Sequence, residues 1–183
     1  MSCIQAIDPD QAPAPVRPIL SAVQESLGAI PNLFRVTANS PAALDALVGA
    51  IGALSKGTIK PSAREAIALT VAEANGCDYC LSAHAALGNG AGLSETDIED
   101  ARRGRATDPK LNAMLAFART LVRNRGDVAN SDVEQLRSVG VTDGEIVEIA
   151  ANVAVNIFTN YLNGAADTAI DFPVVRAGLP IAA

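Results

Sequence analysis

Hydrophobic residues recur along the chain at the spacing of helices, and no stretch shows a sustained alternation of apolar and polar positions. Alanine and leucine dominate these segments, whereas the aromatic residues that favour strands make up only 3% of the sequence. The pattern therefore predicts an all-α fold. At 183 residues the chain is long enough to bury the core of one domain without disulfide bonds.

The first 18 residues differ from the rest because they contain four of the ten prolines. Proline is unfavourable inside helices and favours extended backbone. We therefore expect residues 1–18 to form a proline-rich N-terminal arm that wraps a neighbour or is partly mobile. Residues 19–183 are expected to form a single helical domain.

Capping residues and helix breakers predict individual helices within this domain. Ser40 as N-cap, with Pro41 at the first helical position, predicts a helix that ends before "GTIKP" at 57–61. Similar signals predict helices over about 19–27, 107–126 and 130–140.

Two long apolar segments share a common layout, one over about 62–88 and one over about 142–168. Each opens with the pattern of a capping box, Ser62 with Glu65 and Thr142 with Glu145. Each then continues as a helix that is apolar on nearly all sides, which is typical of buried helices. This layout predicts an internal duplication, with repeat 1 at about 62–88 and repeat 2 at about 142–168. The alternative is that two buried helical segments look alike in an alanine-rich chain.

The stretch "NGCDYCLSAH", residues 75–84, contains two of the three cysteines and the only histidine. Asn-Gly is a break signal, so Cys77 and Cys80 are expected in the first turn of a new helix, where free backbone N–H groups and the helix dipole favour a thiolate. On a helix, Cys77, Cys80 and His84 lie within about 60° of one another and share one face. Repeat 2 has neither cysteine nor histidine at the corresponding positions. The first repeat is therefore the candidate site.

Neighbouring groups could assist these thiols. His84, one turn beyond Cys80, can accept or return the thiol proton. Glu65 is first of all a capping residue, but a break before Cys77 would allow its helix to fold back, and a carboxylate in an apolar setting can hold a proton near neutral pH. Tyr79 is a candidate lining residue of the cleft.

Two other interpretations of the cysteine pair remain open. A CxxC with a histidine four positions on could be three-quarters of a structural zinc site, but zinc takes four ligands and only the remote Cys3 is left to supply the last. The pair could also be inert, since free cysteines are often core residues. We expect no bound metal.

Charge and composition exclude several classes of function. The net charge is -6, and the only basic cluster is "ARRGR" at 101–105, so we expect no nucleic-acid partner. Apolar runs are interrupted well before the ~20 residues of a membrane span, and no export signal is recognisable, so we expect a cytoplasmic protein without membrane contact. There is no GxGxxG or P-loop motif, so we expect no nucleotide cofactor.

The spacing of Glu65, Cys77, Cys80 and His84, together with "VAEANGCDYCLSAH", resembles the signature of the AhpD-like branch of the carboxymuconolactone decarboxylase superfamily. The flanks "LGAIPNLFRVTANSPAAL" and "NIFTNYLNGAADTAIDFP" resemble its peroxidase-related members, so the likeness covers roughly residues 20–175. It implies an all-helical fold with an internal repeat, a homo-oligomer such as a trimer or hexamer, and a CxxC that cycles between dithiol and disulfide.

The resemblance also implies roles for individual residues. Cys80 would attack a hydroperoxide, Cys77 would resolve the product, and His84 and Glu65 would relay protons. Two positions depart from the family pattern, because Tyr79 and Gly164 stand where relatives often carry histidine.

The sequence thus predicts a thiol-dependent peroxidase that reduces hydroperoxides and is reset by an external dithiol or a redox partner protein. Three alternatives remain. They are a thiol–disulfide relay for a partner protein, a lactone decarboxylase, and a helical assembly module whose cysteines are only redox-sensitive.

Overall fold

The computed structural model describes residues 3–179, and within that range every regular element is helical. The all-α prediction is confirmed. The elements are a short 3-10 helix (Pro9–Gln11) and the α-helices α1 (Arg17–Leu27), α2 (Asn32–Thr37), α3 (Pro41–Leu54), α4 (Pro61–Asn75), α5 (Asp78–Gly90), α6 (Glu95–Arg102), α7 (Pro109–Arg123), α8 (Asn130–Ser138) and α9 (Asp143–Ala166).

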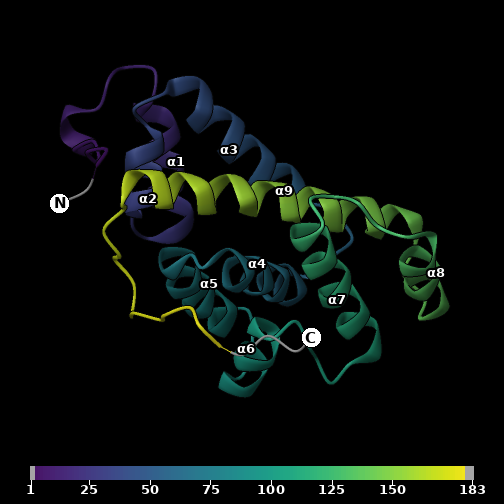
Figure 1. Cartoon of the computed structure of the whole chain (residues 1–183). Helices are drawn as coiled ribbons and strands as arrows, with labels where there is room; N and C mark the ends of the chain where they lie inside the picture. Colours follow the sequence, from purple (N-terminus) through teal and green to yellow (C-terminus); the bar gives the residue numbers. More distant parts are fainter. Residues whose placement is uncertain (1–2, 180–183) are drawn as a thin grey trace.

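Helix α4 is the centre of the fold. It packs against α5, α6, α7 and α9, and every residue from Ala66 to Glu73 is buried. Because other helices surround this stretch of α4, most of its residues are apolar. In Figure 1, the long helix α9 crosses the molecule, with α1, α2 and α3 at one end and α4 and α5 beside it.

The proline-rich start of the chain packs on helices of the same chain. Ala12 and Val16 are fully buried in a small second core, whose other buried members are Leu20, Ala38 and Leu44. The backbone of Cys3 also reaches the end of α9, where its N–H donates to the Ala166 carbonyl (2.7 Å). The described part of the arm, from residue 3, therefore packs on helices of its own chain.

The two predicted capping boxes have different outcomes. Thr142 and Glu145 form one at the start of α9, as the sequence predicts. The predicted box of Ser62 with Glu65 is wrong, because α4 begins at Pro61 with Lys60 as its N-cap residue. Proline fits the first helical position, so Ser62 already lies inside the helix and Glu65 is free to bond elsewhere.

The two segments of the predicted duplication also differ in continuity. The first is divided at Gly76 into α4 and α5, whereas the second is the single 24-residue helix α9. The duplication itself stays a prediction.

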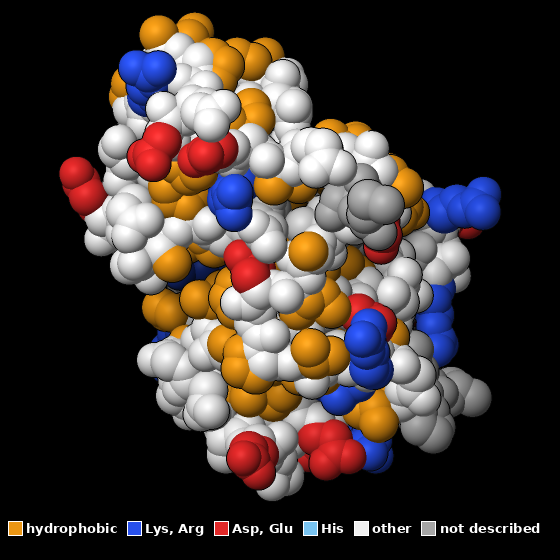
Figure 2. All heavy atoms as spheres, turned by 90° about the vertical axis from the view of Figure 1, so that its left-hand side faces the viewer, with side chains coloured by type: hydrophobic (Ala, Val, Ile, Leu, Met, Phe, Trp, Pro, Cys, Tyr) orange, Lys and Arg blue, Asp and Glu red, His pale blue; other side chains and the backbone are white. Residues whose placement is uncertain are grey.

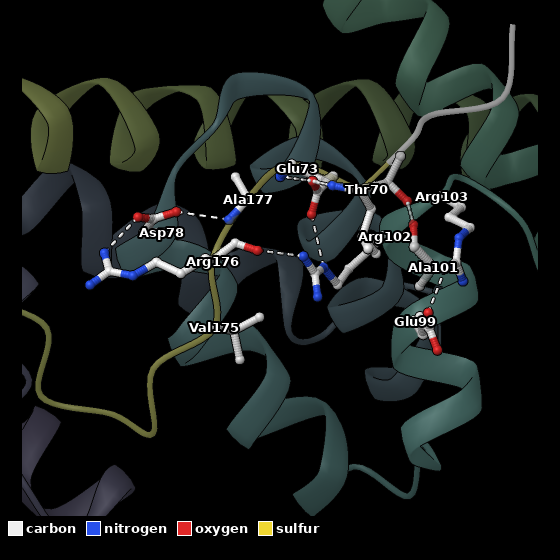
Figure 3. Close-up of polar contacts among 12 residues, drawn as sticks. Thr70, Glu73, Asp78, Glu99, Ala101, Arg102, Arg103, Val175, Arg176 and Ala177 are labelled. Carbon is white, nitrogen blue, oxygen red and sulfur yellow. Dashed lines mark hydrogen bonds and ion pairs between the residues drawn. The ribbon is translucent and has the colours of Figure 1, made fainter.

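Residues 167–179, which we call the C-terminal strap, run from the end of α9 across α5 towards α6 (Figure 1). The buried Glu73 carboxylate holds the strap, since its Oε1 accepts from the N–H groups of Gly178 (2.6 Å) and Leu179 (2.8 Å). Its Oε2 accepts from Arg102 Nε (2.8 Å), which balances the charge (Figure 3). Glu73 is thus a structural residue that fixes the strap.

Asp78 supplies a second anchor for the strap at the start of α5. Its carboxylate accepts from the Ala177 N–H (2.8 Å) and from Arg176 Nη1 (2.7 Å), as Figure 3 shows. These bonds hold the pKa of Asp78 below its usual range.

None of the described helices is both long and apolar enough to cross a bilayer.

Candidate active site

The site is built at the junction of α4 and α5. Helix α4 ends at Asn75, and Gly76 adopts a left-handed conformation (φ 66°) that favours glycine. Cys77 is the N-cap of α5, and its Sγ accepts a hydrogen bond from the Cys80 backbone N–H (3.3 Å). The predicted break and the position of both cysteines in the first turn are confirmed.

The two sulfur atoms of the pair are 2.7 Å apart, and both cysteines are free thiols. Cys77 donates to Cys80, and this bond lowers the pKa of Cys80 to about 6, against the opposing effect of burial. The charge of His84 and the amides of Asn163 and Asn160 lower it further. The same bond, together with burial, raises the pKa of Cys77. Cys80 is therefore the thiolate near neutral pH, and Cys77 keeps its proton.

Glu65 and His84 form an ion pair between α4 and α5, with Glu65 Oε2 2.8 Å from His84 Nδ1. Burial disfavours the charged imidazolium, but the charge and hydrogen bond of Glu65 outweigh burial and raise the pKa of His84. A further hydrogen bond to the Asn156 side chain acts in the same direction. The fold-back of α4 beside α5 that the sequence allows is therefore present, and His84 is equipped to carry a proton.

Tyr79 stands beside the cysteines but makes structural contacts. Its hydroxyl accepts from the Leu33 N–H (2.9 Å), and its ring meets Phe172 of the strap edge-on, with centroids 5.9 Å apart. Burial is the main cause that raises the pKa of Tyr79, so its phenol stays protonated. Tyr79 therefore ties α5 to α2 and to the strap.

A cavity of about 390 Å³ opens onto Cys80, His84 and Glu65. Most of its lining is apolar and comes from α1, α2, α3, α5, α9 and the strap. The larger apolar side chains are Leu27, Leu33, Phe34, Ile51, Leu54, Leu87, Val155 and Phe172. Tyr79 also lines it, whereas Cys77 does not. On the face that Figure 2 shows, patches of hydrophobic side chains lie between scattered charged groups.

Sequence analysis missed the contribution of α9. Asn163 Nδ2 donates to Cys80 Sγ (3.3 Å), and Asn156 lines the cavity beside His84. The four buried asparagines of this helix lie three or four residues apart and so share one face: Asn152, Asn156, Asn160 and Asn163. A row of asparagines on one face of an otherwise apolar helix can be recognised in the sequence and indicates a buried polar site.

Within residues 3–179, no group of three histidine, cysteine or acidic side chains is arranged to hold a metal ion. Cys3, the only other possible soft ligand, is exposed. The arrangement around Cys80 instead combines a thiolate, a second thiol and a proton carrier, which are the groups needed for thiol redox chemistry.

We expect alkylation of Cys80 by iodoacetamide to reach half its maximal rate near pH 6, because only the thiolate reacts and the pKa of Cys80 is lowered to about 6. Below this pH the thiol is protonated and the rate should fall. The measurement is the rate of labelling of the Cys80 peptide by mass spectrometry, with glutathione as the reference thiol. A half-maximum near pH 8.5, the value of an unperturbed cysteine, would contradict the assignment.

Comparisons with known proteins show which proteins this chain resembles. Residues 38–123 match the model of the Carboxymuconolactone decarboxylase family. The fold also matches the "alkylhydroperoxidase AhpD core" of an uncharacterized peroxidase-related protein from Ralstonia eutropha JMP134, with a TM-score of 0.85, 26% identity, and coverage of 93% of this chain and 92% of that chain. The family match and the peroxidase-related neighbours together support an AhpD-like protein of the carboxymuconolactone decarboxylase superfamily.

Two further structures have the same AhpD-like fold. A peroxidase-related protein from Silicibacter sp. TM1040 is 28% identical, with a TM-score of 0.78 and coverage of 92% of this chain and 94% of that chain. The debrominase Bmp8, solved in complex with 2,3,4-tribromopyrrole, is 22% identical, with a TM-score of 0.80 and coverage of 93% and 92%. No curated protein shows a significant match. Proteins with this fold thus include one named as peroxidase-related and one named as a debrominase.

Proposed function

We propose that this AhpD-like protein is a thiol-dependent peroxidase that reduces organic hydroperoxides through Cys80 and Cys77. The observation that carries the proposal is the position of Cys80, a buried thiolate that faces an apolar cavity and has a second thiol 2.7 Å away. An apolar cavity suits the organic part of a hydroperoxide.

The first step is attack of the Cys80 thiolate on the distal oxygen of the hydroperoxide. The O–O bond breaks, the sulfur is oxidised to a sulfenic acid, and the organic part leaves as an alcohol. His84 lines the cavity and its pKa is raised, so it can supply the proton that the departing alkoxide needs. Glu65 stabilises the imidazolium that donates it.

The second step joins the two sulfurs. Cys77 attacks the sulfenic sulfur of Cys80, a disulfide forms, and water leaves. The two sulfur atoms are 2.7 Å apart, which is close to the length of about 2.05 Å of a disulfide bond, so little movement is needed. An external dithiol then supplies two electrons and two protons to restore both thiols, and is itself oxidised to a disulfide.

The test is a single-turnover titration of the reduced protein with one equivalent of cumene hydroperoxide. We expect the loss of two thiols per chain and one equivalent of cumyl alcohol, followed by recovery of both thiols with dithiothreitol. Peptide mapping should find the disulfide between Cys77 and Cys80, with the exposed Cys3 still free. Thiol loss without the alcohol, or a main product that contains Cys3, would refute the proposal.

A second candidate reaction is the reductive removal of bromine from an aromatic ring. The observation that favours it is the apolar cavity on Cys80, in a fold shared with a debrominase. Both thiols would again end as a disulfide, while hydrogen replaces bromine and bromide leaves. Incubation of the reduced protein with 2,3,4-tribromopyrrole separates the two candidates, because only this reaction releases bromide.

A further inference from the structure

Helix α9 brings two buried amides to the rear of the reactive sulfur. Asn160 and Asn163 are 3% and 4% exposed, and neither lines the cavity that opens onto Cys80. Asn163 Nδ2 donates to Cys80 Sγ at 3.3 Å. The sulfur therefore has the cavity in front of it and amide groups of α9 behind it.

The neighbouring Asn160 has a fixed orientation. Its Oδ1 accepts from Asn75 Nδ2 (2.9 Å), at the end of α4, so its own Nδ2 is turned the other way. Apart from its effect on Cys80, that Nδ2 has no hydrogen-bond partner in the part of the chain that the structure describes. Burying an amide N–H group without a hydrogen-bond partner costs free energy, and this cost is offset when a nearby negative charge attracts the group.

We infer that Asn163, with Asn160 beside it, is a catalytic residue that stabilises the thiolate of Cys80 and thereby makes the Cys77–Cys80 disulfide easier to reduce. The inference rests on the proposed thiol–disulfide cycle, whatever the oxidant is. Amide donors bond a thiolate more strongly than a neutral disulfide sulfur, because the bond to the ion is charge-assisted. They therefore favour the reduced state, and a stabilised reduced state makes a disulfide a stronger oxidant.

The ionisable groups around Cys80 come from the other elements. They are Cys77 as the N-cap of α5, Tyr79 and His84 on α5 and, behind His84, Glu65 on α4. Arg64 of α4 and Asp171 of the strap line the same cavity. The side chains that α9 brings to the sulfur are neutral amides. Replacing Asn163 therefore changes the bonding of the thiolate without removing a titrating group.

Asn163→Leu tests the inference, because leucine fills a similar volume without a donor. We expect the half-maximal pH of Cys80 alkylation to rise by about one unit, which is the loss of one charge-assisted bond. The equilibrium with dithiothreitol should shift roughly tenfold towards the protein disulfide, or about 30 mV to more negative potential. Asn163→Asp has nearly the same shape but places a carboxylate by the sulfur, so it should raise the half-maximal pH further.

Thr70→Val is the matched control, because it removes another buried polar contact of the core, the bond from Thr70 Oγ1 to the Ala101 carbonyl (2.7 Å). It should leave both readouts unchanged. An unchanged half-maximal pH in folded Asn163→Leu or Asn163→Asp would overturn the inference. If the wild-type protein did not react with hydroperoxides while the Asn163 variants still shifted both readouts, the peroxidase proposal would be refuted. The inference about Asn163 would then still stand.

Discussion

Cys80→Ser should abolish hydroperoxide consumption, with a residual rate no higher than that of the buffer. A serine hydroxyl is not ionised near neutral pH and cannot replace a thiolate whose pKa is about 6. Cumyl alcohol release from cumene hydroperoxide measures the loss. The cavity should stay intact because the two side chains are similar in size, so circular dichroism and the melting temperature should change little.

Cys77→Ser is the matched variant and should behave differently. Cys80 still meets the hydroperoxide, and a serine hydroxyl can still donate a hydrogen bond to its sulfur, as Cys77 does over 2.7 Å. One equivalent of alcohol should therefore form, after which a sulfenic acid accumulates on Cys80 because no second thiol resolves it. Trapping with dimedone and mass spectrometry detect it. If the sulfenic acid appeared on Cys77 of Cys80→Ser instead, the nucleophile would be misassigned.

Glu65→Gln should slow the reaction of the reduced enzyme with hydroperoxide by roughly 10²- to 10⁴-fold, the range typical of lost acid–base assistance. Glutamine can still bond His84 Nδ1, so the fold should be retained, but it has no charge to raise the pKa of His84. The imidazole would then be largely neutral at pH 7 and could not protonate the leaving alkoxide. Stopped-flow kinetics of peroxide consumption measures the effect.

Glu145→Gln supplies the control for the change of charge. Glu145 caps α9 through the Thr142 N–H (2.8 Å) and pairs with Lys110 (2.7 Å), and neither residue lines the cavity. Glutamine keeps the cap and loses a partly exposed ion pair, which is worth about 1 kcal/mol or less. The peroxide rate should stay at the wild-type level. Equal slowing by both substitutions would mean that Glu65 acts only on the structure.

The parts of this fold that sequence analysis predicts correctly depend on short-range chemistry. Ser40 caps α3, which has Pro41 at its first position, and Gly76 ends α4 just before Cys77. Each effect is decided by residues within one helical turn. The predicted capping box at Ser62 fails for a local reason too, because Pro61 takes the first helical position and the helix starts two residues earlier than predicted.

The parts that sequence analysis misses depend on segments far apart in the chain. Asn163 is 83 positions from Cys80, and Glu73 meets the strap more than 100 positions later. No periodicity within α5 shows which polar side chains another helix will place against it. The pairing of Glu65 with His84 lies between these cases, because the break at Gly76 makes the fold-back possible and packing decides it.

The reliance of Cys80 on α9 has a consequence for the protein during its own synthesis. During translation, Cys80 is added to the chain 63 residues before Asp143, the first residue of α9. Until that helix is made and docks, the amides of Asn160 and Asn163 are absent, and an unfolded cysteine is an ordinary thiol that is largely protonated at pH 7. The nascent chain is thus less open to premature oxidation, and full reactivity begins only when folding is complete.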